Sequence, residues 1–170
     1  MSVSELSTST QNYLKAIWGL KEWSSEPVTA TLIAKQLGLK LSSVSDAVRK
    51  MAKQGLVSHT PYGSVELTEL GRQYALVMVR RHRLLESFLV QALGYTWDEV
   101  HNEAENLEHA VSDMLIERVD KFLDYPTRDP HGDPIPTVDG QITIPSAHRL
   151  TDSGAPVSYT HLTLPTIYSV

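Results

Sequence analysis

Apolar side chains recur at helical spacing along the chain, and they predict a first helix over residues 7–23. The apolar side chains that form a stripe along this segment are Tyr13, Leu14, Ile17, Trp18 and Leu20. A short second helix is predicted over residues 29–37, with a threonine at its start and a glycine directly after it. A third is predicted from a cap at Ser42 or Ser43 to about Gln54. Its buried side is expected to hold Val44, Val48, Met51 and Ala52.

The run VSHTPYGSVELT predicts a small β-hairpin, because two extended runs, 57–60 and 64–67, flank a Pro-Tyr-Gly turn. Three helices followed by a hairpin is the order of a winged helix-turn-helix. Further helices are predicted over residues 68–93 and 96–110, and a last one begins at a Ser112 cap. The apolar face of the last helix is expected to hold Leu115, Val119 and Phe122. We therefore predict a mainly α fold, with a winged helix-turn-helix followed by an all-helical domain.

The composition changes after Tyr125, where PTRDPHGDPIPTVDGQITIP is dense in proline, glycine and aspartate. This stretch has too few apolar residues for a core and is typical of a linker. We place the winged helix-turn-helix at 1–74, the helical domain at 75–137 and a linker at 138–156.

Residues 157–170 are interpreted as an artefactual tail. The string VSYTHLTLPT, from Val157 to Thr166, is the translation of a DNA sequence resembling a transposase-type sequencing adapter. A genuine β-strand is the alternative, since Tyr159, Leu162 and Leu164 alternate with polar residues. We leave this tail, with its His161, out of the functional argument and expect the natural protein to continue beyond Pro156.

Charge and composition narrow the function classes. The chain has no cysteine, which excludes disulfides and zinc–thiolate sites. It has no apolar run long enough to span a membrane and no signal peptide, so we expect a cytoplasmic protein without a membrane partner. The net charge is −5, yet residues 28–83 carry nine basic and three acidic side chains, a balance of +6 that leaves −11 elsewhere. A basic segment beside an acidic one indicates a DNA-binding module joined to a cation-binding one.

The third predicted helix is the candidate for reading double-stranded DNA. A helix fits the major groove, and the side chains of its first turn reach base edges. Those side chains are Lys40, Ser42, Ser43 and Asp46, and three cations further along suit phosphates: Arg49, Lys50 and Lys53. The alternative is a winged helix used for protein contacts.

The two helices after the hairpin carry a candidate metal centre. His82 and Glu86 stand one helical turn apart in RRHRLLESF, and VHNEAENLEHAVSD contributes four more residues to one helix face: His101, Glu105, Glu108 and His109. Buried carboxylates repel one another unless a cation lies between them. Oxygen-rich sites with imidazole and no sulfur suit Mn(II) or Fe(II).

Two other interpretations of these residues stay open. They could form a solvated helix face, or the metal could be hydrolytic. The sequence has no nucleophile with a matching base and no phosphate-binding glycine loop, so we expect no enzyme.

Five segments resemble the diphtheria toxin repressor family of iron- and manganese-dependent repressors: QNYLKAIW, ELTELGR, RRHRLLESFL, EVHNEAENLEH and PTRDPHGDPIP. The resemblance covers about residues 7–136. It implies a homodimer whose winged helices bind a palindromic operator and whose later helices form the dimerisation and metal-binding domain. In many relatives an SH3-like domain follows the linker, so we expect the linker here to lead to such a domain in the natural protein.

The resemblance also implies two metal sites. The primary site falls on Asn12, Glu105, Glu108 and His109, and the ancillary site on His82, Glu86 and His101. Iron-responsive members have cysteine where Glu105 stands and manganese-responsive members have glutamate, so the resemblance implies Mn(II), with Fe(II) as the alternative. At Asn12 the manganese type usually has aspartate and the iron type methionine, so this chain offers an uncharged oxygen there.

Overall fold

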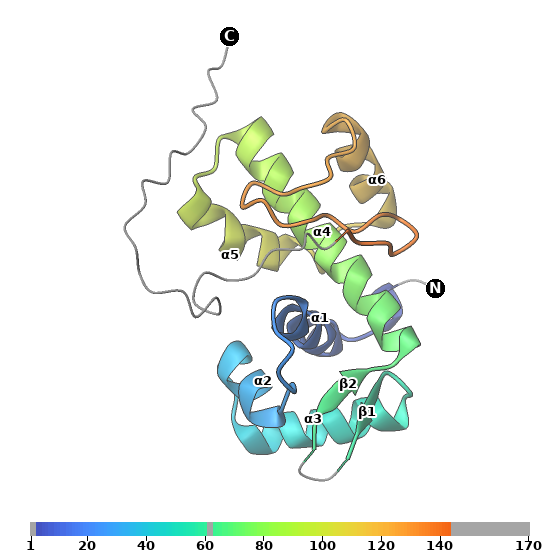
Figure 1. The fold of residues 1–170 in the computed structure, drawn as a ribbon. Helices are drawn as coiled ribbons and strands as arrows, with labels where there is room; N and C mark the ends of the chain where they lie inside the picture. Colours follow the sequence, from blue (N-terminus) through green and yellow to red (C-terminus); the bar gives the residue numbers. More distant parts are fainter. Residues whose placement is uncertain (1–2, 61–62, 144–170) are drawn as a thin grey trace, which may run out of the picture.

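The computed structural model describes residues 3–60 and 63–143 and contains six helices, a 3₁₀ turn and one two-stranded sheet in those ranges (Figure 1). In chain order the elements are η1 (Val3–Glu5), α1 (Thr8–Glu22), α2 (Ala30–Leu37), α3 (Leu41–Lys53), β1 (Val57–His59), β2 (Val65–Leu67), α4 (Glu69–Leu93), α5 (Trp97–Leu107) and α6 (Asp113–Phe122). Figure 1 shows α2, α3 and the hairpin at one end, α5 and α6 at the other, and α1 between them. The predicted mainly α fold is confirmed.

The winged helix-turn-helix is formed by α1 to β2. Ser7 and Thr29 cap α1 and α2 through side-chain oxygens that accept hydrogen bonds from backbone amides, and the cap at Thr29 confirms the prediction. The hairpin pairs β1 with β2 in antiparallel register. The expected serine cap of α3 is wrong: the helix begins at Leu41, with Lys40 at its N-cap and no side-chain cap. Both serines therefore lie within the first turn.

The helix α4 belongs to two hydrophobic cores. Its N-terminal half contributes Tyr74, Ala75 and Met78 to the core of the winged unit. Its C-terminal half contributes Leu84 and Leu89 to a second core, which also includes residues of α5 and α6. Since one helix of 25 residues joins the two cores without a break, it holds them at a fixed distance.

The last helix buries a different face from the one predicted. Ile116 and Val119 are buried, whereas Leu115 and Phe122 are 45% and 66% exposed. The apolar stripe at 115, 119 and 122 was therefore only partly a core face. The apolar side chains of Leu115 and Phe122 are therefore exposed at the surface of this single chain.

Residues 127–136 pack against α4, and the prediction that the segment after Tyr125 is too polar to join a core is wrong for them. Ile135 is 6% exposed and belongs to the second core. Arg83 donates to the carbonyl of Pro134 at 2.6 Å, and Arg128 and Pro134 form a β-bridge. The artefact proposed for 157–170 lies outside the described residues. None of the described helices combines the length and apolar character needed to cross a membrane.

Candidate metal centre and DNA-binding helix

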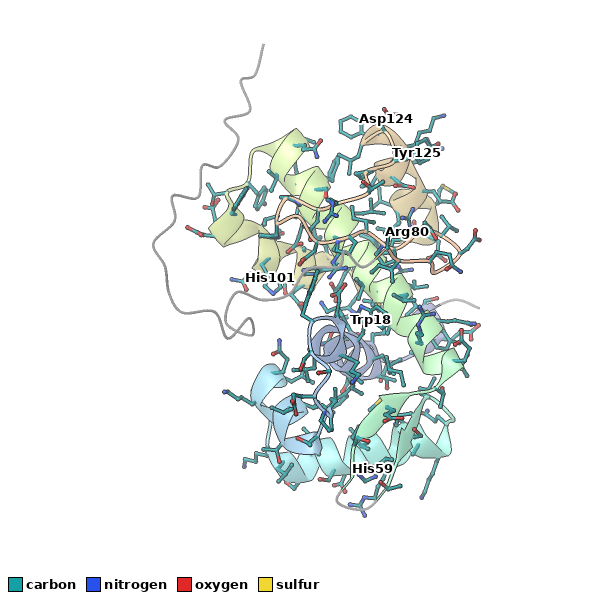
Figure 2. All side chains as sticks on the ribbon, viewed as in Figure 1. Trp18, His59, Arg80, His101, Asp124 and Tyr125 are labelled. Atoms are coloured by element: carbon teal, nitrogen blue, oxygen red, sulfur yellow. The ribbon has the colours of Figure 1, made fainter. Side chains whose placement is uncertain are left out.

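Buried carboxylates and imidazoles meet where α4 and α5 pack together beside α1. The helix α4 positions His82 and Glu86, and α5 positions His101 and Glu105. The helix α5 ends at Leu107, so Glu108 and His109 lie in the turn after it instead of on the predicted longer helix. Glu108 still faces inward, with no exposed surface. Figure 2 shows His101 on the side of α5 toward α1.

His82 lies at the centre of this cluster. Its Nδ1 is 2.6 Å from Glu108 Oε2 and its Nε2 is 2.9 Å from Glu86 Oε1. Burial alone lowers the pKa of His82, but the hydrogen bonds with both carboxylates raise it to about 9. In the absence of a metal ion the imidazole is therefore a cation between two carboxylates.

Two groups of three residues could each hold a metal ion, and they share His82. His82, Glu105 and Glu108 form one group, and His82, Glu86 and His101 form the other, with one ligand atom of each residue within 4.8 Å of the rest. The resemblance assigned His82 to the ancillary set alone. The structure places it in contact with members of both sets.

The remaining predicted ligands are Asn12, on α1, and His109, in the turn after α5. The Oδ1 atom of Asn12 is buried without a hydrogen-bond partner, and Asn12 lines the same hollow as His82 and Glu105. His109 is turned toward α1, with Nδ1 2.6 Å from Gln11 Oε1, and its Nε2 is 3.5 Å from Glu108 Oε1. An unpartnered buried carbonyl oxygen in a hollow that is also lined by a carboxylate and an imidazole suits a hard divalent cation. These donors therefore fit a metal ion.

Lys15 was not predicted as part of this site. It reaches from α1 to both carboxylates of the first group, forming an ion pair with Glu105 and one with Glu108 at 2.6 Å. Burial tends to raise the pKa of Glu105, but the hydrogen bond and charge of Lys15 outweigh it and lower that pKa. Lys15 follows Asn12 by three residues and so shares its helix face, the signal that could have revealed it.

A third group combines Glu86 with Asp129 and His131 from the segment after α6. His131 Nδ1 lies 3.6 Å from Glu86 Oε2 and 4.0 Å from Asp129 Oδ2. Burial raises the pKa of Asp129, and the neighbouring acids add to that rise. Neither Asp129 nor His131 was predicted as a site residue, because the segment that contains them was interpreted as a linker. Glu86 thus faces one group with each of its oxygens.

The predicted DNA-reading side chains lie exposed along α3 and at its N-cap: Lys40, Ser42, Ser43, Asp46, Arg49, Lys50 and Lys53. Val44, Val48 and Met51 hold the opposite face in the core. Asp46 forms an ion pair with Arg49, so its charge is partly neutralised next to the surface that would face phosphates. The hairpin tip at residues 61–62 lies outside the described residues.

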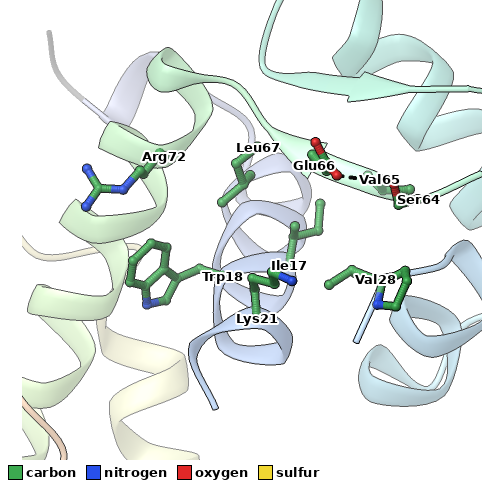
Figure 3. Close-up of a pocket in the computed structure, with 10 residues that line it drawn as sticks. Ile17, Trp18, Lys21, Val28, Ser64, Val65, Glu66, Leu67 and Arg72 are labelled. Carbon is green, nitrogen blue, oxygen red and sulfur yellow. Dashed lines mark hydrogen bonds between the residues drawn. The ribbon is translucent and has the colours of Figure 1, made fainter. Parts of the chain in front are cut away.

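A separate apolar hollow of about 260 Å³ lies between α1, β2 and the start of α4 (Figure 3). Ile17, Val65 and Leu67 line it, and the Arg72 guanidinium stacks on the Trp18 ring at 5.4 Å from its centroid. It contains none of the three metal-ligand groups.

The fold and the metal centre define a two-domain class in which a winged DNA-binding domain precedes a helical, metal-binding one. Residues 5–65 match the family described as "Iron dependent repressor, N-terminal DNA binding domain". Residues 68–137 match "Iron dependent repressor, metal binding and dimerisation domain". The chain belongs to the iron-dependent repressor family, the family of the diphtheria toxin repressor.

Relatives named for iron and for manganese are both similar to this chain. The iron-dependent repressor IdeR of Mycobacterium tuberculosis is 40% identical over 134 residues, which cover 79% of this chain and 58% of IdeR. IdeR of Mycobacterium leprae is 36% identical over 165 residues, 92% of this chain and 71% of that protein. A solved manganese-dependent transcriptional repressor in complex with manganese is 57% identical, with a TM-score of 0.77 over 81% of this chain and 63% of its own. This chain thus spans about three fifths of the first relatives it matches.

Proposed function

We propose that this protein is a manganese-responsive transcriptional repressor that binds DNA when its metal centre is loaded. The observation that carries the proposal is the oxygen-rich group of Glu105 and Glu108 with His82, together with the unpartnered oxygen of Asn12, which lines the same hollow as Glu105 and His82. Two carboxylates and an amide oxygen without sulfur suit Mn(II) over thiophilic metals. The similar solved repressor is a manganese complex, which supports the same metal.

The residues that would hold the primary ion are Asn12, Glu105, Glu108 and His109, with His82 also within reach. His82, Glu86 and His101 would hold an ancillary ion, next to Asp129 and His131. A bound divalent ion would supply positive charge between buried carboxylates and a cross-link between elements. Because Asn12 lies on α1 while Glu105 lies on α5, that cross-link would tie the winged unit to the helical domain.

The partner would be double-stranded DNA with a palindromic operator, bound by a homodimer. The helix α3 would enter the major groove with its exposed serines and lysines, one α3 for each half-site. The α5–α6 end of the chain carries exposed apolar side chains, which favour this end as the dimer interface: Trp97, Met114, Leu115 and Phe122. The regulated genes would be those for metal uptake.

Metal would act by fixing the spacing between the two α3 helices of the dimer. Within the winged unit, α1 and α3 share one hydrophobic core, so a metal tie from α1 to α5 would limit the orientations of α3. DNA selects one spacing, and metal and DNA then favour the same state. Coupling of this kind is typically about 1–3 kcal/mol.

The test is fluorescence anisotropy of a labelled duplex from upstream of the gene or of a neighbouring metal transporter. Protein is titrated without metal, with Mn(II), with Fe(II) under anaerobic conditions and with Zn(II). We expect binding that is much tighter with Mn(II). Tighter binding with Fe(II) would instead indicate an iron-responsive repressor of the same type.

A matched pair of variants tests the site itself. Glu105→Ala should lose the metal dependence of DNA binding, whereas Glu103→Ala, on the same helix and in none of the three groups, should retain it. An unchanged metal dependence in Glu105→Ala would refute the mechanism. Equal DNA binding by the wild-type protein without added metal and with each metal would instead indicate a winged-helix regulator with a purely structural metal, whereas a graded loss of DNA binding on reversible removal of the metal would exclude that alternative.

A further inference from the structure

The ammonium group of Lys15 lies among the carboxylates that would ligate the primary metal ion. It contacts Oε1 of Glu105 and Oε1 of Glu108, the latter at 2.6 Å, and lies 3.5 Å from Nδ1 of His82. These three residues are one of the groups whose ligand atoms could hold a metal. The side chain of Lys15 is only 16% exposed, so it is committed to this contact.

We infer that Lys15 is a competing cation built into the metal site, and that it sets the site's affinity for divalent ions. The inference rests on the proposed function. A divalent ion ligated by Glu105 and Glu108 needs the oxygens that now accept from Lys15, so one cation must leave before the other binds. The free energy of the Lys15 contacts is therefore subtracted from the free energy of metal binding.

The burial of Glu108 explains why a competing cation is needed. Its side chain has no exposed surface, and a buried carboxylate without a cation is strongly disfavoured. Lys15 on one oxygen and His82 on the other neutralise it. The protein can thus hold Glu108 in the geometry of a metal ligand before metal arrives, at a cost in affinity.

Because Lys15 lies on α1, the replacement of its ammonium group by a metal ion also changes how α1 is attached to the α5 region. Lys15 and Asn12 lie three residues apart on one helix face, about 4.5 Å along the axis. Without metal, α1 is tied to the α5 region through Lys15, and with metal it would be tied through Asn12. Metal binding then replaces the Lys15 tie of α1 by a tie through Asn12, and the orientation of α3 that favours DNA is the one that the Asn12 tie imposes.

The experiment measures Mn(II) affinity and metal-free stability in the same variants. Lys15→Met removes the charge and keeps the length of the side chain. Lys21→Met removes the same charge from the exposed side of α1, where the Lys21 ammonium donates to the Ser25 carbonyl, and is the matched control. Lys15→Arg keeps a cation at the site. Isothermal titration with Mn(II) gives the Kd, and thermal unfolding in chelator and in saturating Mn(II) gives the two midpoints.

We expect Lys15→Met to bind Mn(II) at least about tenfold more tightly, a gain of about 1.4 kcal/mol. The same variant should unfold at a lower temperature in chelator, since Glu108 loses a partner. Adding Mn(II) should raise the unfolding midpoint of Lys15→Met by more than it raises the midpoint of the wild type. This difference can be measured even if the metal-free variant is largely unfolded. Lys21→Met should match wild type, and Lys15→Arg should bind no more tightly than wild type.

The outcomes separate this inference from the proposed function. If wild type binds Mn(II) and Lys15→Met binds it equally or more weakly, Lys15 is a structural ion pair and the inference is overturned while the metal site stands. If neither protein binds Mn(II), the proposed metal site fails and the competition fails with it. Opposite changes in metal affinity and metal-free stability support the inference, because a merely structural lysine would not improve metal binding.

Discussion

The ion pair between Glu22 and Arg83 offers a quantitative test of how α1 is attached to α4. Arg83 donates to both oxygens of Glu22, at 3.0 and 2.7 Å, and to the carbonyl of Pro134 at 2.6 Å. Asp129 and Asp133 lie farther from it, at 3.8 and 3.9 Å. The side chains of Arg83 and Glu22 are 9% and 2% exposed, so neither is well solvated. Removing one partner of such a buried pair is costly because the other stays desolvated.

The structure predicts unequal costs for the two single variants. Glu22→Gln keeps the shape and leaves Arg83 with the Pro134 carbonyl and two nearby carboxylates, so we expect a loss of about 1.5–3 kcal/mol. Arg83→Met leaves Glu22 and Asp129 buried without that cation, and we expect a loss of about 3–5 kcal/mol. The double variant should be less destabilised than the sum of the two, with a coupling of about 1–3 kcal/mol.

The assay is urea unfolding in chelator at constant pH, followed by circular dichroism and tryptophan fluorescence. Arg118→Met, on the exposed face of α6, is the control and should change the free energy of unfolding by less than about 0.5 kcal/mol. Additive losses, or a larger loss for Glu22→Gln than for Arg83→Met, would refute the assignment of Arg83 as the shared cation of this cluster.

Three further predictions concern single groups. Gly71→Ala should destabilise by at least about 2 kcal/mol in urea unfolding, because its Cβ would lie 1.9 Å from the Leu56 carbonyl oxygen; Gly19→Ala, with nothing within 4 Å, should not destabilise. Ser112→Ala removes the hydroxyl that caps α6 and should cost about 1 kcal/mol, and no change would contradict that role. The pKa of His82 is raised to about 9, so its stabilisation is complete below pH 6.5 and lost as the pH rises through 9. Metal-free protein should therefore unfold more easily at pH 9.5 than at pH 7, by up to about 3 kcal/mol, and His82→Gln should flatten that dependence.

Local patterns predicted most of the helical fold. Apolar spacing located α1, and the predicted caps Thr29 and Ser112 located the starts of α2 and α6, each within a residue or two. These signals act within a few residues of chain, so they can be read without the tertiary structure. The cap of α3 was misplaced because Ser42 and Ser43 resemble caps in composition, whereas the backbone enters the helix two residues earlier.

The residue types that form the candidate site were predictable from the sequence, whereas the contacts between residues far apart in the chain were less so. Helical spacing brought His82 and Glu86 together, and the same reasoning found Glu105. The contacts of Lys15 and His131 depend on how α1 and the segment after α6 pack on α4, which is a long-range property. Such contacts leave no periodic trace in a single sequence.

The unbroken α4 has a consequence for how the molecule can be divided. Its only glycine, Gly71, lies in its first turn, and it has no proline, so the helix has no built-in point of bending. A fragment ending at residue 74 would lose Ala75 and Met78 from its own core, and the complementary fragment would start in the middle of a helix. The two units are therefore expected to unfold cooperatively, because unfolding of one unit also removes core contacts from the other.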